Sequence, residues 1–441
     1  MISALIGFAV LGLLILVRVP IAFAMGLVGF FGFAIERGLT FENFFDFRWK
    51  VPLSMVSSHV VYTTQEYGLS VIPLFVLMGN FVGRSGLAGE LYGAAYAWLG
   101  HRRGGLAMST VLACGGFSAI CGSSLATAAT MSRVAIPPMR RFNYHDSLAT
   151  ASIAAGGTLG ILIPPSVILI IYGVFTETSI RELFAAGVVP GLLGVMLYVV
   201  AVRYVVWRTP EAGPPGEATP RAERWRALAR VYGVLLLFLL VIGGIYAGVF
   251  TPTEAAGIGA TGAFLIALAK RSLSLSILLE ILRDSVKTSA MLFTILIGAL
   301  TLSSFVTRTG FPNLLADWLT GLGVPAMATL FAMLAIYIVL GMILESLSML
   351  LLTLPVFFPI VQQLGFDPVW FGIVVVVVTE ISLITPPVGL NVFVLSAMVP
   401  DIPTRTIFRG VVPFWIVDIL RLALLVAIPA LSLWLPSLLY R

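Results

Sequence analysis

The sequence predicts an all-α polytopic membrane protein with an inverted repeat, two re-entrant helical hairpins and two discontinuous helices. The chain has 441 residues, of which 59% are hydrophobic and 10% are charged, whereas soluble domains carry about 25% charged residues. A bilayer span needs roughly 20 apolar residues, and the chain supplies about a dozen such segments. Polar interruptions of these segments recur at a nearly fixed offset in the two halves of the chain. The net charge of +6 fits basic cytoplasmic loops better than nucleic-acid binding.

The first half of the chain opens with predicted spans at residues 2–17 and 20–36, followed by a mixed, interfacial segment at 37–68. The elements that follow are a span at 69–83, an amphipathic stretch up to residue 103, an interrupted apolar region up to residue 177, and a span at 181–206. Residues 209–220 are rich in Pro, Gly, Glu and Ala and have no apolar run to bury. This composition predicts a mobile loop that divides the chain into halves.

The second half begins with predicted spans at residues 231–249 and 253–269. Thr251-Pro252-Thr253-Glu254 predicts a capping box with proline at the first helical position of the second of these spans. The remaining elements are an amphipathic segment up to Lys287, a span up to residue 306, two interrupted apolar segments at 324–360 and 367–399, and a final span at 411–437.

The two halves contain matching motifs, which indicates an internal duplication. Val82-Gly83-Arg84-Ser85-Gly86 resembles Val306-Thr307-Arg308-Thr309-Gly310 at an offset of 224 residues. Pro137 and Pro164 pair with Pro359 and Pro386 at an offset of 222 residues. At that same offset, Ile163-Pro164-Pro165-Ser166 falls on Thr385-Pro386-Pro387-Val388. Several matches in nearly one register are a strong signal of duplication.

The distribution of basic residues indicates that the two copies have opposite orientations. The loops that flank the first hairpin carry His101-Arg102-Arg103 and Arg140-Arg141, whereas no Lys or Arg occurs from Thr309 to Thr404. Because loops rich in Lys and Arg stay in the cytoplasm, the same element faces the cytoplasm once and the other side once. About 15 helical residues reach only about 23 Å, so each hairpin is expected to turn near the middle of the membrane.

Breaks inside helices expose backbone groups that bind ions in secondary transporters with inverted repeats. We expect a first cation site where the hairpin tip Gly122-Ser123-Ser124 faces the break at Gly156-Gly157-Thr158, with Gly122, Ser123, Ser124, Gly156 and Thr158 as its residues. We expect a second cation site where Glu345 and Ser346 face Thr379, Ser382 and Thr385. Hard oxygen donors without His or Cys suit Na⁺ better than a transition metal. We expect an anionic substrate to lie among Thr127, Pro165, Ser166, Ser348 and Asn391, with Arg133 as the nearest cation.

These motifs resemble those of one transporter family. Gly156-Gly157-Thr158-Leu159-Gly160, Ile163-Pro164-Pro165-Ser166 and Thr385-Pro386-Pro387-Val388-Gly389-Leu390-Asn391 look like the large membrane subunit of TRAP (tripartite ATP-independent periplasmic) transporters. The resemblance covers essentially the whole chain. It implies an elevator mechanism, Na⁺ symport, a location in the bacterial inner membrane, a small four-helix membrane partner encoded as a separate chain, and a periplasmic binding protein that delivers an organic acid. Glu345 departs from the family, which commonly has Asp followed by Pro at this tip.

The resemblance also implies a division into scaffold and transport parts. The expected parts are scaffold helices at 1–68, a first repeat at 69–180 with hairpin 1 and the first broken helix, scaffold spans at 181–287 with a cytoplasmic linker at 209–229, a second repeat at 288–400 with hairpin 2 and the second broken helix, and a C-terminal scaffold span at 401–441.

Other functions fit the sequence less well. The main alternative is a stand-alone, ion-coupled organic-anion symporter of the same broad superfamily, which needs no partner proteins. Gly257-Ile258-Gly259-Ala260-Thr261-Gly262 matches a dinucleotide-binding pattern but lies inside a span, so no nucleotide cofactor is expected. No nucleophile motif supports an enzyme. Glu380 is a candidate ion ligand or charge partner because carboxylates are costly inside a membrane, and Asp418 and Arg421 are expected to form a local ion pair.

Overall fold

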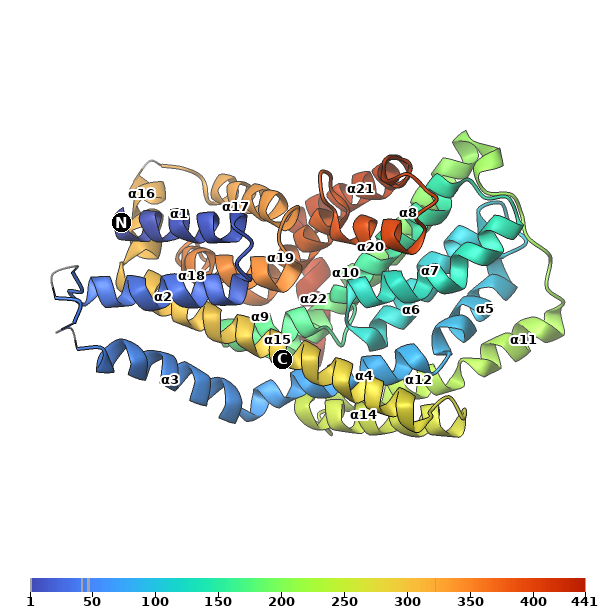
Figure 1. The fold of residues 1–441 in the computed structure, drawn as a ribbon. Coiled ribbons are helices and arrows are strands. Elements are labelled where there is room, and N and C mark those ends of the chain that lie inside the picture. The colour runs from blue at the N-terminus through green and yellow to red at the C-terminus, as the bar shows by residue number, and fades with distance from the viewer. Residues whose placement is uncertain (1, 41–42, 46–47, 322, 441) are drawn as a thin grey trace. The chain divides into compact units, whose positions relative to one another are not determined.

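The computed structural model describes residues 2–40, 43–45, 48–321 and 323–440 (Figure 1). Throughout these residues the regular structure is helical, and no β-strand occurs within them. The predicted all-α fold class is therefore confirmed. Part of the predicted interfacial segment, residues 41–42 and 46–47, lies outside the described residues.

Six of the described helical segments are long and apolar enough to cross a membrane, or seven if the bent pair Arg221–Arg230 and Tyr232–Tyr246 is one span. The six are Tyr67–Arg84, Ile180–Arg208, Pro252–Ala269, Leu275–Arg308, Ser346–Gln363 and Thr404–Ala427. Shorter apolar helices lie at Ile2–Leu16, Ile21–Glu36, Gly105–Cys121, Val167–Thr176, Ala326–Gly341, Pro368–Ile384 and Ala430–Tyr440. The predicted dozen apolar segments correspond to both groups together, and only the first group has full spanning length.

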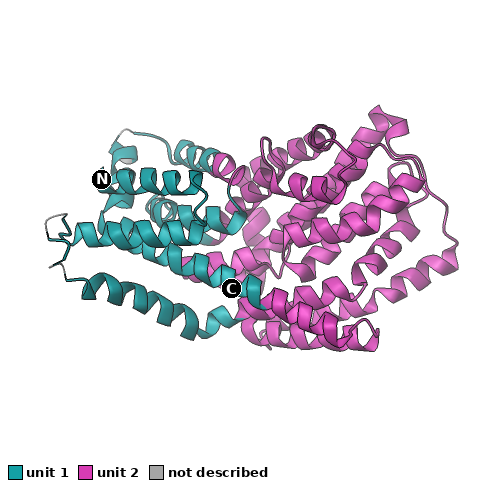
Figure 2. Cartoon of the chain, in the orientation of Figure 1, with its two compact units in different colours: residues 1–70, 286–336, 344–368 teal, residues 71–285, 337–343, 369–441 magenta. Residues whose placement is uncertain are grey.

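The contacts within the chain divide it into two compact units, which Figure 2 shows in different colours. Unit 1 comprises residues 1–70, 286–336 and 344–368, and unit 2 comprises residues 71–285, 337–343 and 369–441. Each unit is described by itself. The division into scaffold and transport parts concerns movement in a membrane and stays a prediction.

Unit 1 contains the N-terminal helices α1 (Ile2–Leu16), α2 (Ile21–Glu36) and α3 (Lys50–Gln65), together with α16 (Phe311–Gly321), α18 (Ser346–Gln363) and the later part of α15 (Leu275–Arg308). Helix α2 packs directly on the backbone of α15, because a Cβ atom on Gly29 would lie 2.5 Å from the Leu302 nitrogen. Helices α16 and α18 also pack together. Glycine at position 29 therefore permits the close approach of two helices that are far apart in the sequence.

Unit 2 is built around three helices, α6 (Gly105–Cys121), α7 (Ser124–Arg141) and α8 (Asp146–Thr158), which pack on one another. The surrounding helices are α4 (Val71–Arg84), α5 (Leu87–Leu99), α9 (Val167–Thr176), α10 (Ile180–Arg208), α11 (Arg221–Arg230), α12 (Tyr232–Phe238), α13 (Gly244–Tyr246), α14 (Pro252–Ala269), α19 (Pro368–Ile384), α20 (Leu390–Met398), α21 (Thr404–Ala427) and α22 (Ala430–Tyr440). Helix α17 (Ala326–Gly341) has residues in both units. Helix α20 packs on α7 and α8, so parts of both sequence repeats meet inside unit 2.

The helices reproduce the predicted duplication. Helix α7 starts at Ser124 and α18 starts at Ser346, 222 residues later, and both are 18 residues long. Helix α8 starts at Asp146 and α19 starts at Pro368, at the same offset. In both copies the second helix ends before a Pro-Pro pair, after which a short helix, α9 or α20, continues the chain. The predicted hairpins and interrupted helices are therefore present at the predicted positions.

Two predicted elements differ in the structure, and a third, the capping box, is confirmed. The amphipathic segment and the span before residue 306 form one continuous helix, α15, of 34 residues. The predicted final span is broken between α21 and α22, because Pro429 cannot donate a backbone hydrogen bond and Ile428 leaves the helical conformation at φ −129°. The predicted capping box is present, since the Thr251 hydroxyl accepts from the Glu254 N–H and the Glu254 carboxylate accepts from the Thr251 N–H.

The linker at 209–220 is anchored, so the prediction of a mobile loop is wrong. The Gly104 N–H donates to the Gly213 carbonyl at 2.8 Å, and the Gly216 N–H donates to the Gly100 carbonyl at 2.8 Å. The His145 N–H donates to the Ala212 carbonyl at 3.1 Å. Backbone hydrogen bonds thus hold a segment that has almost no apolar side chains to bury.

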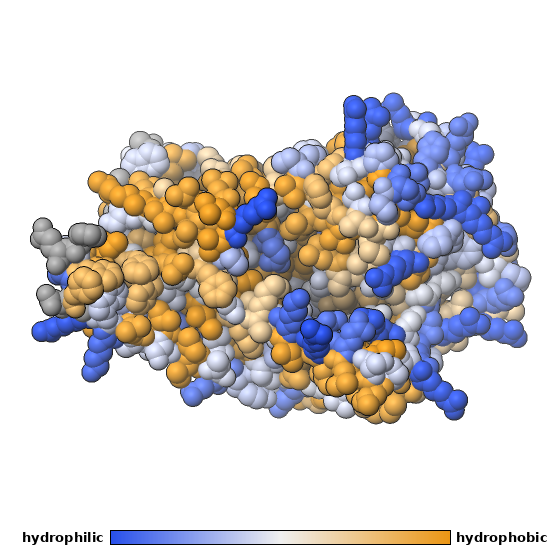
Figure 3. Space-filling model, in the orientation of Figure 1, coloured by the Kyte–Doolittle hydropathy of each residue, from blue (hydrophilic) through white to orange (hydrophobic). Residues whose placement is uncertain are grey.

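The surface has the character expected of a membrane protein. Large apolar side chains on the N-terminal helix are exposed, including Leu13 at 60% and Leu16 at 81%. In Figure 3, hydrophobic residues cover much of the visible face over α1 and α2, whereas hydrophilic residues gather at the end of unit 2 that carries the α10–α11 linker. Such wide exposed apolar surface is rare on soluble monomers.

Candidate ion and substrate site

The first hairpin tip is a sharp turn between α6 and α7. Gly122 ends α6 with a left-handed φ of +63°, a conformation that glycine adopts without steric cost. Ser123 is the N-cap of α7, and its hydroxyl accepts a hydrogen bond from the Ala126 N–H at 3.4 Å. The N-terminus of α7 thus lies at the tip and points its free N–H groups toward it.

The tip lies against the first helix break, as the sequence predicts. A Cβ atom on Gly157 would lie 3.2 Å from the Ser124 carbonyl oxygen, and one on Gly160 would lie 3.1 Å from the Ser123 carbonyl oxygen. A Cβ atom on Gly122 would lie 3.1 Å from the carbonyl oxygen of Pro165. Glycines therefore allow the backbone carbonyls of the tip and of the break to gather, and such oxygens can coordinate a cation.

Gly156 has a different position from the one expected. A Cβ atom on Gly156 would lie 2.9 Å from the Cys114 sulfur, so this glycine packs against α6 and not against the tip. Its neighbour Gly157 and the later Gly160 face the tip instead. The sequence places all of these glycines in the same break, but the rotation of α8 decides which of them approaches Ser123 and Ser124.

The hydroxyls near the first break are buried and differ in their partners. The Thr158 Oγ1 atom lies 2.7 Å from the Ala155 carbonyl, to which it donates, and 3.1 Å from the Tyr198 hydroxyl. Ser166 caps α9, because its hydroxyl accepts from the Leu169 N–H at 3.3 Å, and it also donates to the Ile161 carbonyl. The Thr127 hydroxyl is fully buried and has no nitrogen or oxygen partner within the described part of the chain.

The second hairpin tip, in unit 1, is capped by a carboxylate. Glu345 is the N-cap of α18, and one of its carboxylate oxygens accepts from the Leu347 N–H at 3.1 Å and from the Ser348 N–H at 3.3 Å. Ser346 and Ser348 are buried beside it in the first turn. Glu345 therefore occupies the position that Ser123 has in the first repeat, and a charged group replaces a hydroxyl at the cap.

The remaining residues of the expected second cation site lie on or directly after α19, in unit 2. The Thr379, Ser382 and Thr385 hydroxyls donate to carbonyls of their own helix at 2.6 to 2.8 Å. Their lone pairs remain as acceptors, and that of Thr385 accepts from the Trp415 indole at 3.0 Å. Glu345 and Ser346 belong to unit 1, so the predicted meeting of these two groups stays a prediction.

Asn391 links the two sequence repeats inside unit 2. Its amide donates to the Ala154 carbonyl of α8 at 3.0 Å, and its Oδ1 atom is buried without a hydrogen-bond partner among the described residues. It therefore lies beside the first broken helix, although it follows the second one in the sequence. The Asn391 Oδ1 atom therefore remains available as a hydrogen-bond acceptor.

A cavity of about 600 Å³ lies beside the first tip in unit 2. Its polar lining residues are Asn80, Arg84, Cys121, Thr130, Arg133 and Asp284. Arg84 is paired with Glu280 at 2.5 Å, whereas Arg133 is exposed and has no ion-pair partner in the part of the chain described. Arg133 is thus a cation near the tip, as expected, at the edge of a water-accessible space.

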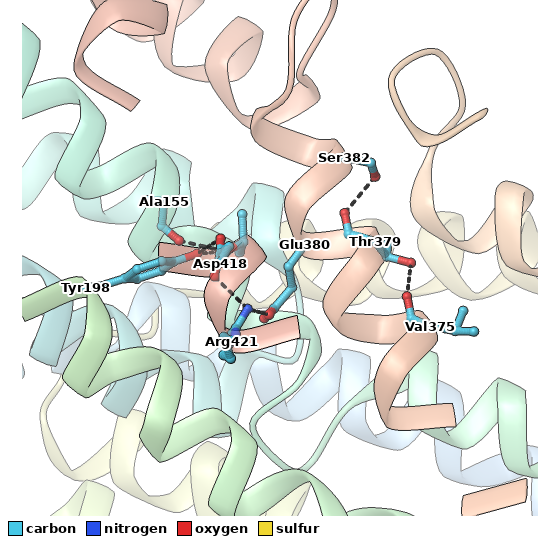
Figure 4. Close-up of polar contacts among 9 residues, drawn as sticks. Ala155, Tyr198, Val375, Thr379, Glu380, Ser382, Asp418 and Arg421 are labelled. Carbon is cyan, nitrogen blue, oxygen red and sulfur yellow. Dashed lines mark hydrogen bonds and ion pairs between the residues drawn. The ribbon is translucent and has the colours of Figure 1, made fainter. Parts of the chain in front are cut away.

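A buried charged cluster was only partly predicted. Arg421 forms an ion pair with Asp418 at 2.9 Å, as the i, i+3 spacing predicts, and a second ion pair with Glu380 of α19 (Figure 4). Asp418 also accepts a hydrogen bond from the Tyr198 hydroxyl at 2.5 Å. These four side chains are at most 1% exposed. The signal available in the sequence was the presence of opposite charges in separate apolar segments, where each needs a partner.

The described residues contain no group of three His, Cys, Asp or Glu side chains that could hold a metal ion. The donors available at the first break are backbone carbonyls and hydroxyls. This donor set matches hard monovalent or divalent cations and not transition metals.

Comparisons with known proteins agree with this architecture. The family described as tripartite ATP-independent periplasmic transporter, DctM component, matches residues 8–431. The C4-dicarboxylate TRAP transporter large permease protein DctM of Pseudomonas aeruginosa is 41% identical over 381 residues, covering 85% of this chain and 87% of that protein. Its counterpart in Rhodobacter capsulatus is 34% identical, covering 99% of each chain.

Another similar protein is the sialic acid TRAP transporter large permease protein SiaM of Vibrio cholerae, which is 35% identical over 379 residues and covers 85% of this chain and 87% of its own. Among solved structures, the Alcanivorax borkumensis YdaH transporter matches with a TM-score of 0.63 at 16% identity, covering 88% of this chain and 89% of that chain. At this identity the likeness concerns the fold alone.

Proposed function

Because the chain belongs to the DctM component family of tripartite ATP-independent periplasmic transporters, we propose that it carries an organic acid across the bacterial inner membrane together with Na⁺. In this proposal it is the large permease subunit and has no enzymatic reaction to perform. The observation that carries the proposal is the first hairpin tip, where the Ser124 and Ser123 carbonyl oxygens lie beside Gly157 and Gly160, and the Pro165 carbonyl oxygen lies beside Gly122.

The donors at this tip support Na⁺ as the coupling ion. They are neutral carbonyl oxygens of backbone at or between helix ends, near the C-terminal end of α6, as in secondary transporters with discontinuous helices. Each Na⁺ that crosses a potential of about 100 mV contributes about 2.3 kcal/mol to the transport of its co-substrate. In the proposal the second tip, with Glu345 and Ser346, contributes to a second cation site.

The proposed substrate is an organic acid. Two of the similar permeases are named for C4-dicarboxylates and for sialic acid, and both compounds carry a carboxylate. In this chain Thr127 and Asn391 present buried oxygen atoms without partners among the described residues. We place the substrate near these groups and Ser166, and the positive charge that its carboxylate needs comes from the co-bound cations.

The proposed mechanism is an elevator movement with two partner proteins. A small four-helix membrane subunit stabilises the scaffold, and a periplasmic binding protein delivers the substrate. The alternative, a stand-alone symporter, predicts uptake by this chain without either partner. The two functions therefore differ in an experiment that leaves out one protein at a time.

The test is uptake of a labelled C4-dicarboxylate and of labelled sialic acid into proteoliposomes. We expect uptake of one of them only when the small subunit, the binding protein and an inward Na⁺ gradient are all present. Equal uptake with choline in place of Na⁺ would refute Na⁺ coupling, and equal uptake by the chain alone would favour the stand-alone symporter.

A variant at the first tip locates the ion site. Ser123→Ala removes a hydroxyl from the tip, and we expect it to raise the Na⁺ concentration for half-maximal uptake severalfold. Ser109→Ala is the matched control, since Ser109 is a buried serine of α6 whose hydroxyl donates to its own helix at 2.7 Å. An equal Na⁺ dependence in both variants would place the ion elsewhere.

A further inference from the structure

A continuous chain of side-chain contacts joins the two helix breaks in unit 2. The Thr158 hydroxyl, at the end of α8, lies 3.1 Å from the Tyr198 hydroxyl of α10. Tyr198 donates to Asp418 of α21 at 2.5 Å. Asp418 pairs with Arg421, and Arg421 pairs with Glu380 of α19 (Figure 4). Glu380 follows Thr379 directly and precedes Ser382 by two residues, so the contacts end between two expected ion ligands.

The direction of the hydrogen bonds determines how Thr158 is presented. Tyr198 has one proton, which it donates to the Asp418 carboxylate. The Tyr198 oxygen can therefore only accept from Thr158, whose single proton is shared between the Ala155 carbonyl at 2.7 Å and the Tyr198 oxygen at 3.1 Å. The Thr158 lone pairs are then free of hydrogen bonds, as coordination of a cation requires.

The arrangement is also sterically fixed. The Arg421 guanidinium packs against the backbone of α10, because a Cβ atom on Gly194 would lie 3.1 Å from the Arg421 Cζ atom. The Tyr198 ring packs edge-on against Phe414 at a centroid distance of 5.6 Å. Because these side chains are fully buried and closely packed, a displacement of α8 is transmitted to α19 and is not absorbed by side-chain movement.

We propose that Tyr198, Asp418 and Arg421 are positioning residues that couple the two helix breaks, so that cation binding at one break favours cation binding at the other. This inference rests on the proposed Na⁺ coupling. Ligands bind cooperatively when each of them favours the same arrangement of a shared element. Here the shared element is the pair of broken helices, α8 and α19, and the contacts through Tyr198 hold their ends in one relative position.

The test is Na⁺-dependent thermal stabilisation of the full chain in lipid nanodiscs, with choline chloride keeping the ionic strength constant. In the wild type we expect the unfolding temperature to rise with Na⁺ along a cooperative curve. Tyr198→Phe keeps the packed ring and removes only the hydroxyl. It should raise the half-saturating Na⁺ concentration about fivefold, the lower end of typical coupling between sites, and it should make the curve less steep.

Further variants separate positioning from general stability. Thr158→Val removes the same contact together with an expected cation ligand, so we expect a shift at least as large as that of Tyr198→Phe, and the double variant should show no further shift beyond that of Thr158→Val. Tyr92→Phe is the matched control, since Tyr92 is a buried tyrosine of α5 whose hydroxyl has no hydrogen-bond partner among the described residues. A purely structural role for Tyr198 would lower the unfolding temperature at every Na⁺ concentration and leave the half-saturating concentration unchanged.

The outcomes distinguish the inference from the function on which it rests. If the unfolding temperature of the wild type does not change with Na⁺, the proposed cation sites are refuted, and the coupling between them is refuted as well. A normal response in the wild type that is unchanged in Tyr198→Phe would overturn the coupling alone. A shift in Tyr198→Phe, but not in Tyr92→Phe, would support it.

Discussion

Replacing Arg421 by methionine should destabilise the protein far more than neutralising either of its partners. Arg421 is the positive member of a fully buried cluster with two carboxylates, Glu380 and Asp418. Its removal leaves both carboxylates buried without a counter-charge. Breaking a buried ion pair in this way costs about 3–5 kcal/mol.

Glu380→Gln should have a much smaller effect. It leaves one carboxylate beside one guanidinium, so the charges of the cluster balance, and the glutamine carbonyl can still accept from Arg421. We expect a cost of about 1 kcal/mol, the value of an ordinary hydrogen bond. The prediction that Arg421→Met is more destabilising than Glu380→Gln follows from the number of unpaired charges that each variant leaves in the cluster. It does not depend on the exact free energies.

The assay is denaturant-induced unfolding of the purified protein, followed by the fluorescence of its eight tryptophans. Arg140→Met is the matched control, since Arg140 pairs with Asp401 at the surface, where the two side chains are 43% and 59% exposed. Such exposed pairs contribute under about 1 kcal/mol. The reasoning is refuted if Glu380→Gln costs as much as Arg421→Met, or if Arg140→Met does.

Two further predictions concern the first tip and unit 1. Gly122→Ala should lower the free energy of unfolding by more than about 1–2 kcal/mol, the cost of placing alanine in the left-handed conformation, because the new Cβ would also lie 3.1 Å from the Pro165 carbonyl oxygen. Gly86 also has a left-handed φ, of +77°, but has open space around it, so Gly86→Ala should show only the conformational cost in the same unfolding assay. Burial lowers the pKa of His59, which shares a hydrogen bond with Ser304 at 2.9 Å. Around this pKa the folded state therefore binds fewer protons than the unfolded state, so the free energy of unfolding should fall as the pH drops below about 6.5, the ordinary pKa of histidine. His59→Gln should make the free energy of unfolding less dependent on pH in this range. An unchanged pH profile in this variant would contradict the prediction.

Much of the fold could be predicted from the sequence because the duplication leaves local signals. Proline pairs, glycine-rich breaks and cap residues mark helix ends through backbone chemistry alone. The matching starts of α7 and α18 follow from these signals. The Asp418–Arg421 pair was predictable for the same reason, since its partners are one helical turn apart.

Other features depend on tertiary structure that no local pattern specifies. Glu380 and Arg421 are 41 residues apart, and only the packing of α19 with α21 brings their side chains together. Which glycine faces the tip depends on the rotation of α8, so Gly157 and Gly160 approach it and Gly156 does not. The linker is held in place by backbone hydrogen bonds, which its composition does not reveal.

The equal spacing of the helices in the two copies has a consequence for how the chain tolerates changes in length. From the start of α7 to the start of α8, and from α18 to α19, the two copies have kept the same number of residues, while the flanking motifs have drifted by two positions. A one-residue insertion within α7 would rotate every later side chain of that helix by about 100° and so change the face that α7 packs on α8. Natural insertions and engineered tags should therefore be accepted only outside these two stretches.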